Sequence, residues 1–239
     1  MKKLLLGTAL GATLACGAAG MASAAVIELA LAVDASGSIN ASEWQLQMQG
    51  YANAITAALP TDGTVAVSVI RFANTATVVR SMTEINSAAD LADLAGFFTT
   101  LNQFGDGNLT CITCAIEAAN STFDSDPLTK AVIDVSTDGV YTEGFNPNSA
   151  ADVVGSAEWA VANNTDVVNA LGIGTASPPD FAHGEGSFSM LTPDFEQFEA
   201  ALIAKLRRET GQEVPEPAAL GMFGAMLAGL GLIARRRRA

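Results

Sequence analysis

The strongest constraint on this chain is an apolar run that ends abruptly in a row of oxygen-bearing side chains. Residues 27–33 are apolar at nearly every position, and Asp34, Ser36 and Ser38 follow at alternate positions. Such a run is typical of a central strand in a parallel sheet covered on both faces, and open α/β sheets bind ligands at the carboxyl ends of these strands. A carboxylate with two hydroxyls suits a hard cation such as Mg²⁺. The alternative is an ordinary polar turn, because Asp, Ser and Gly also favour turns.

Three segments together resemble the metal-ion-dependent adhesion site of von Willebrand factor type A (VWA) domains. D-A-S-G-S at 34–38 matches the D-x-S-x-S signature, T-C-I-T-C-A-I at 110–116 matches the loop whose threonine precedes a helix, and S-T-D-G at 136–139 matches the third loop. The resemblance implies a site for Mg²⁺, with Mn²⁺ or Ca²⁺ as alternatives, formed by Asp34, Ser36, Ser38, Thr110 and Asp138. Thr110 has a second interpretation, as a helix cap.

The middle of the chain alternates strands and helices, which predicts an α/β fold. We expect a doubly wound, mostly parallel central sheet with one antiparallel edge strand and helices on both faces, which is the VWA and Rossmann-like architecture. After the first strand, the patterns predict a helix capped by Ser42, strands at 64–72 and 76–82, a helix at 87–101, a strand at 130–137, a helix at 150–163, strands at 166–174 and 187–191, and a helix at 193–209.

Both ends of the chain have the composition of targeting segments. Residues 1–24 read as a signal peptide, with a basic start, an apolar core and an A-x-A cleavage site; a lipoprotein cysteine at Cys16 is the alternative. Residues 25–210 form the predicted VWA domain and 211–217 a linker that contains Pro215, Glu216 and Pro217. Residues 218–239 form an apolar helix long enough to span a bilayer, followed by an arginine cluster.

The C-terminal order of P-E-P, apolar helix and basic cluster resembles the PEP-CTERM sorting signal of Gram-negative bacteria. That resemblance implies processing by an exosortase-type membrane protease. It also implies export, an intermediate held in the inner membrane by the C-terminal helix, and a final place at the cell surface, in the extracellular matrix or in the medium. A plain C-terminal membrane anchor is the alternative.

The charge of the central region excludes one class of partner. The whole chain has a formal net charge of −13, and six basic residues are concentrated in the two end segments. The remaining 25–214 region carries 24 acidic and six basic residues, a net charge of −18. Such a surface repels phosphate backbones, so nucleic acid binding is not expected.

Three features could indicate other chemistry. His183 is the only histidine and no G-x-S-x-G motif accompanies it, so we do not expect an enzyme. Asp134 lies four residues before Asp138, about 13 Å away in a strand, and cannot share its site. Cys111 and Cys114 form a C-x-x-C motif, for which a disulfide, a redox pair and free buried thiols remain open.

Two functions follow from these observations. The first is a surface binding module, in which the metal keeps one position for an Asp or Glu carboxylate of an unknown protein partner. The second is a structural or assembly component of the cell envelope or exopolysaccharide matrix, in which the metal only stabilises the loops. The sequence does not identify the partner.

Overall fold

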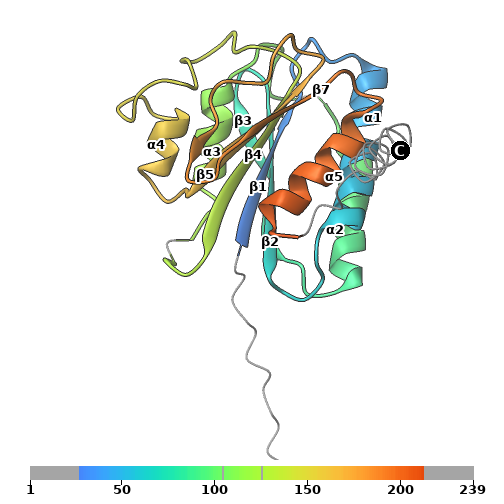
Figure 1. Cartoon of the computed structure of the whole chain (residues 1–239). Helices are drawn as coiled ribbons and strands as arrows, with labels where there is room; N and C mark the ends of the chain where they lie inside the picture. The colour runs from blue at the N-terminus through green and yellow to red at the C-terminus, as the bar shows by residue number, and fades with distance from the viewer. Residues whose placement is uncertain (1–26, 104, 125, 213–239) are drawn as a thin grey trace, which may run out of the picture.

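A seven-stranded sheet forms the centre of the molecule (Figure 1), in the order β3-β2-β1-β4-β5-β6, with β7 also pairing with β5. The computed structural model describes residues 27–103, 105–124 and 126–212. The strands are β1 (Ile27–Asp34), β2 (Val65–Phe72), β3 (Ala76–Glu84), β4 (Lys130–Thr137), β5 (Val167–Ile173), β6 (His183–Gly184) and β7 (Ser189–Thr192). The signal peptide, the Pro-Glu-Pro motif and the C-terminal apolar helix expected from the sequence lie outside the described residues.

Alternate residues of β1 pack against opposite layers of helices. Leu29, Leu31 and Val33 face α1, α2 and α5, whereas Ala30 and Ala32 face α3 and α4. Figure 1 shows these two groups of helices on opposite sides of the sheet. The helices are α1 (Ala41–Ala58), α2 (Ala88–Thr100), α3 (Ile112–Asn120), α4 (Ala157–Val161) and α5 (Phe198–Glu209). Because both faces are covered, β1 is apolar in nearly every position, as parallel strands in α/β proteins are.

The sheet is mostly parallel, as the sequence predicts. β1 pairs in parallel with both β2 and β4, and β4 pairs in parallel with β5. β3 is the antiparallel edge strand, joined to β2 by a hairpin. A second antiparallel pairing, between the two-residue strand β6 and the start of β5, was not predicted. It lies within the segment 178–186, which the sequence indicated to be a loop.

The position of β1 makes the carboxyl ends of β1 and β4 the edge of the sheet at which a ligand is expected. The chain leaves β1 through α1 to reach β2 on one side, and it later returns to add β4 on the other side. At such a reversal of strand order the loops that follow the two central strands diverge, and α/β sheets bind ligands there. Asp34 ends β1, and Asp138 follows the last residue of β4.

Three helix starts differ from the sequence prediction. The cap of α1 is Asn40 rather than Ser42: its Oδ1 accepts bonds from the backbone N–H groups of Ser42 and Glu43, and the Glu43 carboxylate accepts a bond from the backbone N–H of Asn40. The predicted helix 150–163 is reduced to α4, because Gly155 adopts a φ of 80° and Ser156 caps a new start. The start predicted at residue 193 is five residues too early. There the Asp194 side chain binds the backbone N–H of Gln197 and favours a turn over a helix.

Aromatic packing holds the helices of one face together. Tyr51 of α1 stacks on Phe98 of α2 at a centroid distance of 4.7 Å, and its edge meets Phe198 of α5 at 5.2 Å. All three rings are fully buried. This contact fixes α1, whose first residues follow the D-A-S-G-S loop. Across the part of the chain that the structure describes, no helix is both long and apolar enough to cross a bilayer.

Candidate metal centre

Asp34 is the buried centre of the candidate site. It ends β1 and has no solvent-exposed surface. One carboxylate oxygen accepts a 2.8 Å hydrogen bond from the backbone N–H of Ser36, and the other accepts a 2.6 Å bond from the Thr137 hydroxyl. Since Val33 pairs with Ser136 in the parallel register, Asp34 lies level with Thr137 at the ends of β1 and β4. The register of the two strands therefore orients the carboxylate.

Three further oxygens continue from Asp34 towards solvent. The hydroxyls of Ser36 and Ser38 lie 3.1 Å apart, and Ser38 donates a 2.7 Å bond to the Asp138 carboxylate. Ser36 is buried, whereas Ser38 is exposed. The structure thus brings four of the five predicted ligands into one hydrogen-bonded group at the carboxyl end of the sheet.

Thr110, the fifth predicted ligand, is bonded through its backbone to the loop that follows Asp138. Its N–H donates to the Thr142 hydroxyl at 2.9 Å, and its carbonyl accepts from the N–H groups of Thr142 and Glu143 at 2.9 and 3.2 Å. The residue that caps α3 is Cys111, so the alternative interpretation of Thr110 as the helix cap is wrong. Thr110 is buried and is held against the loop that follows Asp138.

The loop at 102–108 supports the D-A-S-G-S loop from one side. The Gln103 side chain donates to the carbonyls of Ser36 and Ile39 at 3.3 and 2.7 Å, and the backbone N–H of Gly37 donates to the Asn108 carbonyl at 2.9 Å. The Asn74 side chain accepts from the backbone N–H groups of Asn108 and Leu109. The position of the D-A-S-G-S loop therefore depends on Gln103 directly and on Asn74 through the backbone of Asn108.

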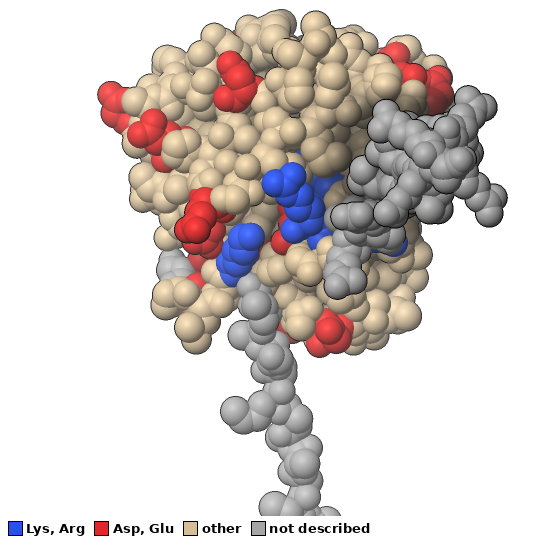
Figure 2. Space-filling view, in the orientation of Figure 1, with Lys and Arg blue, Asp and Glu red and all other residues tan. Residues whose placement is uncertain are grey.

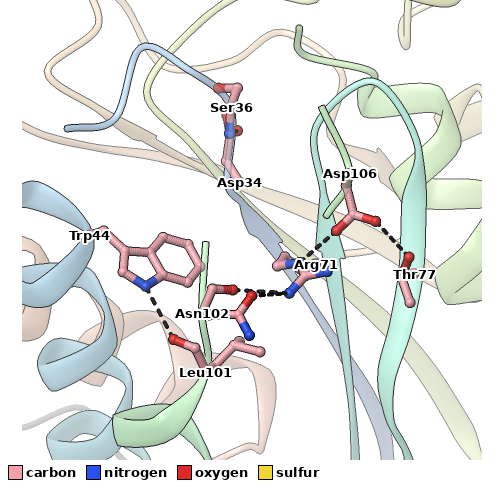
Figure 3. A network of polar contacts seen from close by, with 8 residues as sticks. All are labelled: Asp34, Ser36, Trp44, Arg71, Thr77, Leu101, Asn102 and Asp106. Atoms are coloured by element: carbon pink, nitrogen blue, oxygen red, sulfur yellow. Dashed lines mark hydrogen bonds and ion pairs between the residues drawn. The ribbon is translucent and has the colours of Figure 1, made fainter. Parts of the chain in front are cut away.

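A buried ion pair anchors that supporting loop (Figure 3). Arg71 of β2 contacts Asp106 at 2.5 Å and also donates to Asn102, while Thr77 of β3 donates to the second Asp106 oxygen at 2.6 Å. Figure 3 shows Arg71 on β2 and Thr77 on β3, with Asp106 and Asn102 on the loop and with Asp34 and Ser36 at the end of β1. The Arg71 guanidinium already compensates the charge of the Asp106 carboxylate, so Asp106 supports the loop and is not a candidate ligand.

Burial raises the pKa values of both site carboxylates. The pKa of Asp34 is raised to about 6, mainly because burial disfavours its charged form, and the hydrogen bonds from Thr137 and Ser36 oppose the shift in part. The pKa of Asp138 is also raised by burial, with the Ser38 hydrogen bond opposing it. Among the described residues, neither carboxylate has an ion-pair partner. A cation bound between them would remove this electrostatic cost.

The spacing of the oxygens fits a small octahedral cation. Adjacent ligands of Mg²⁺ lie about 3.0 Å apart, because each is about 2.1 Å from the ion and they subtend a right angle. The Ser36–Ser38 and Ser38–Asp138 oxygen separations are 3.1 and 2.7 Å. The described residues contain no group of three or more His, Cys, Asp or Glu side chains that could hold a metal, so hydroxyls must supply part of any coordination here. Hydroxyl and carboxylate oxygens fit Mg²⁺ better than a softer metal.

The two cysteines lie directly beside Thr110. Cys111 and Cys114 form a disulfide at the start of α3, and the Cys111 sulfur accepts a bond from the backbone N–H of Cys114. Cys111 is fully buried, and its N–H donates to the Ala73 carbonyl at 2.7 Å. The disulfide therefore acts together with the backbone hydrogen bonds of Thr110 to hold the chain at that residue.

Two residues considered from sequence lie away from the site. Asp134 is buried within β4, where its carboxylate contacts Lys205 of α5 at 2.6 Å. His183 is exposed in β6 and pairs with Val168, near the start of β5. Val168 pairs with Ile133, and Ile133 is level with Ala30. His183 is therefore far from the end of the sheet at which Asp34 lies.

Sequence analysis missed the residues that support the ligands. Thr137 could have been noticed, because it directly precedes Asp138 at the end of a predicted strand, but the strand register that sets it opposite Asp34 is not visible in the sequence. Gln103 and Thr142 lie in loops with no motif of their own. No local signal identifies the partners of loop side chains.

Comparison with solved structures identifies the same fold in other proteins. Proximal thread matrix protein 1 from the mussel byssus matches with a TM-score of 0.62 at 19% identity, over 78% of this chain and 47% of that one. The pilus adhesin SpaC from Lactobacillus rhamnosus GG matches with a TM-score of 0.57 at 17% identity, over 78% and 31% of the two chains. A von Willebrand factor type A protein from Catenulispora acidiphila matches with a TM-score of 0.55 at 16% identity, over 80% and 44%.

These similarities establish the VWA fold, and this chain matches less than half of the length of each of the three proteins. A further structure of the mussel protein, described as having a zinc-occupied MIDAS motif, matches with a TM-score of 0.62 at 20% identity over 78% of this chain and 46% of that one. Comparison with curated protein sequences finds no match. The family model described as "Protein of unknown function (DUF1194)" matches residues 24–214. The chain belongs to this family, and its fold is that of a VWA domain.

Proposed function

We propose that this protein is a binding module that holds a divalent cation, Mg²⁺, through Asp34, Ser36, Ser38 and Thr110, with Asp138 completing the site. The observation that carries the proposal is the group of oxygens from Asp34, Ser36, Ser38 and Asp138 at the carboxyl end of the sheet, in which burial raises the pKa of both carboxylates and, among the described residues, neither has an ion-pair partner. The bound cation would supply a strongly electrophilic position for the carboxylate of a protein partner.

The neighbouring residues orient these oxygens and limit their motion. Thr137 holds the Asp34 carboxylate, Gln103 holds the backbone of the D-A-S-G-S loop, and Thr142 holds the backbone of Thr110. Only one of the direct ligands, Asp34, is charged if Asp138 acts through its bond to Ser38. Few anionic ligands leave a cation with net positive charge, which favours an anionic ligand from outside the protein.

The solved structures of similar fold support this proposal. One is a pilus adhesin, and another contains zinc in the MIDAS motif of a matrix protein. The same matrix protein favours a second candidate, a structural component of the envelope or exopolysaccharide matrix in which the metal only stabilises the three loops. The buried position of Asp34 is compatible with that role as well.

The proposal also includes the route to the cell surface. Residues 1–24 would direct export, the C-terminal helix would hold an intermediate in the inner membrane, and an exosortase-type protease would cut near Pro215, Glu216 and Pro217. The net negative charge of the 25–214 region is compatible with this location, and it does not favour nucleic acid binding. Figure 2 shows one face, on which acidic side chains are scattered and the few basic ones gather in a small group.

Calorimetry on the purified protein tests the metal site. Wild type should bind Mg²⁺ and Mn²⁺, Asp34→Ala should bind neither, and Glu196→Ala should behave like wild type because Glu196 is an exposed carboxylate elsewhere. Circular dichroism should show that all three are folded. Identical titrations of wild type and Asp34→Ala would reject the metal site.

A second comparison separates the two candidate roles. Thr110→Ala keeps the backbone bonds of Thr110 and removes one proposed ligand. If the protein is a binding module, this variant should lose metal-dependent binding of a carboxylate probe while its thermal unfolding stays close to that of wild type. If the metal is only structural, the loss of the ligand should appear as a lower unfolding temperature in Mg²⁺.

A further inference from the structure

A preformed groove begins next to the candidate metal centre. It has a volume of about 370 Å³ and is lined by residues that directly follow Asp138, namely Gly139, Val140 and Tyr141, and by the segment between β5 and β6. Gly139, the residue next to Asp138 in the chain, is part of its lining, and consecutive Cα atoms are 3.8 Å apart. Any partner bound at the metal would therefore lie beside this groove.

The groove is apolar and its walls are stiff. Ile112 and Phe181, both buried, contribute to its lining together with Pro147, Pro178 and Pro179. Proline rings fix the backbone φ angle, so these walls lose little conformational entropy when a partner binds. The volume is within the range of sites that bind small ligands or single side chains. These properties favour an apolar side chain as the occupant.

Exposed apolar side chains gather on the two loops that carry Thr110 and Asp138. Among the described residues, nine large apolar side chains are exposed, and four of these belong to the two loops: Leu109, Val140, Tyr141 and Phe145. Val140 is 76% exposed and Phe145 is 66% exposed. Concentrations of this kind mark binding surfaces. Here the surface adjoins the groove.

The charge of the groove restricts the partner further. Its one charged lining residue is Asp180, which is exposed, and no Lys or Arg contributes to the lining. A second carboxylate of the partner would be repelled there, whereas a basic or neutral residue would not. A partner segment should therefore have a carboxylate where it meets the metal and a neutral or basic residue where it meets the groove.

We propose that the partner of the metal site is a protein segment with one Asp or Glu and, about two residues before or after it, a large apolar side chain that enters this groove. The residue next to that apolar side chain is neutral or basic. This inference rests on the proposed metal-dependent function and names the partner's chemistry. In an extended segment, side chains two residues apart point the same way and lie about 7 Å apart. That separation is similar to the one or two residues by which the lining residues Gly139 and Val140 follow Asp138 in the chain.

The groove also discriminates between two sources of carboxylate. An acidic polysaccharide offers carboxylates on every acidic sugar but has no large apolar side chain. It would leave the apolar groove unfilled, and it would place further negative charge near Asp180. The structure therefore favours a protein over an acidic polysaccharide as the partner.

Short peptides test the inference on the purified protein in excess Mg²⁺. In one pair of peptides, Asp and Leu are separated by one Gly, in either order, and Lys lies beside Leu. Matched peptides replace Leu by Gly or Lys by Glu. Glucuronate represents acidic sugars. The Leu peptides should bind about tenfold more tightly than the Gly peptides, as expected for burying much of a Leu side chain. Replacing Lys by Glu should weaken binding in wild type, and less so in Asp180→Asn.

Two variants assign the effect to the groove. Ala176→Trp places a large ring at the groove and should abolish the preference for Leu while leaving Mg²⁺ binding unchanged. Ala89→Trp, an exposed site on α2 across the sheet, should leave both unchanged. Equal binding of Leu and Gly peptides, or equal binding of glucuronate, would overturn the groove inference while the metal-dependent function stands. If no carboxylate probe binds although Mg²⁺ does, the proposed function fails and the inference fails with it.

Discussion

Ser38 and Asp138, one hundred residues apart in the chain, are joined by a 2.7 Å hydrogen bond from the serine hydroxyl to the aspartate carboxylate. The bond connects the loop after β1 to the loop after β4 and closes the row of oxygens that begins at Asp34. It exists because β1 and β4 are neighbours in the sheet, and therefore end at the same edge.

We expect Thr137→Val to weaken metal binding although Thr137 is not a proposed ligand. Its hydroxyl donates to Asp34 at 2.6 Å, and residues that orient a metal ligand typically contribute about 10–100-fold to metal affinity. Calorimetric titration with Mg²⁺ measures the change. Thr56→Val is the matched control, because its hydroxyl bonds only to the Ala52 carbonyl within α1. Unchanged affinity in Thr137→Val would show that Asp34 does not depend on this bond.

Stability without metal should fall as the pH rises through the raised pKa of Asp34. A buried carboxylate with a pKa of about 6 in the folded state binds its proton more tightly there than in the unfolded state, where the value is about 3.8. The contribution of Asp34 to the free energy of unfolding is therefore highest below pH 4 and decreases up to about pH 6, by an amount on the order of 3 kcal/mol.

Urea unfolding in EDTA between pH 4 and 7.5 measures this slope. Asp34→Asn should have a smaller slope, because one titrating group is removed, and Mg²⁺ should restore the stability of wild type at pH 7.5. If wild type and Asp34→Asn have the same slope in EDTA, the carboxylate does not carry this electrostatic cost.

Removing the buried lysine of α5 should be strongly destabilising. Lys205 contacts Asp134 and Glu209, each at 2.6 Å, and none of the three side chains is accessible. Lys205→Ala removes the cation and leaves a buried carboxylate charge without a partner, which typically costs about 3–5 kcal/mol. Joint replacement by Leu at 134, Met at 205 and Leu at 209 should recover most of this loss. Urea unfolding measures both, and a mild effect of Lys205→Ala would mean that the carboxylates are neutral.

The raised pKa of Glu209 explains why the buried cluster of Asp134, Lys205 and Glu209 can contain two acidic side chains. Burial and the nearby Asp134 raise the pKa of Glu209 to about 8, so it carries a proton at neutral pH and the cluster stays close to neutral overall. Glu209 should accordingly contribute a decrease in stability as pH rises from about 4.5 through 8, and urea unfolding of Glu209→Gln should show the loss of this contribution while that of Asp34 remains.

Thiol labelling should find no free cysteine in mature protein that is unfolded without a reductant. The bridge spans a sequence separation of three, so its entropic contribution to stability is only about 2 kcal/mol. Cys111→Ser with Cys114→Ser should lower the unfolding temperature modestly. It should also lower Mg²⁺ affinity, because the pair borders Thr110. Two labelled thiols per chain would show that the cysteines act only in packing.

Mass spectrometry of the native protein tests the sorting signal. If an exosortase-type protease removes the tail, the mature C-terminus should lie near Pro215 to Pro217. The N-terminus should lie near Ala25. Mature protein that keeps the arginine cluster would leave a plain C-terminal membrane anchor.

The sequence alone determined the class of fold and the approximate residues of the candidate site. The apolar run at 27–33 predicts a buried strand whatever its neighbours are, because a continuous apolar strand is stable only when both faces are covered. Asp34, Ser36 and Ser38 follow that strand directly, so their common position needed no tertiary information. The strand at 130–137 was predicted for the same reason and agrees with β4.

Only the tertiary structure decided which residues surround these oxygens. The pairing of Asp34 with Thr137 depends on the register between β1 and β4, and the contact of Gln103 with Ser36 depends on how two distant loops pack. Helix starts such as Phe198 depended on competing side-chain bonds, here from Asp194 to Gln197. The groove beside Asp138 is formed by residues that precede β5 in the chain and by residues that follow it. Contacts between distant residues follow from packing of the whole chain, and local sequence patterns do not encode them.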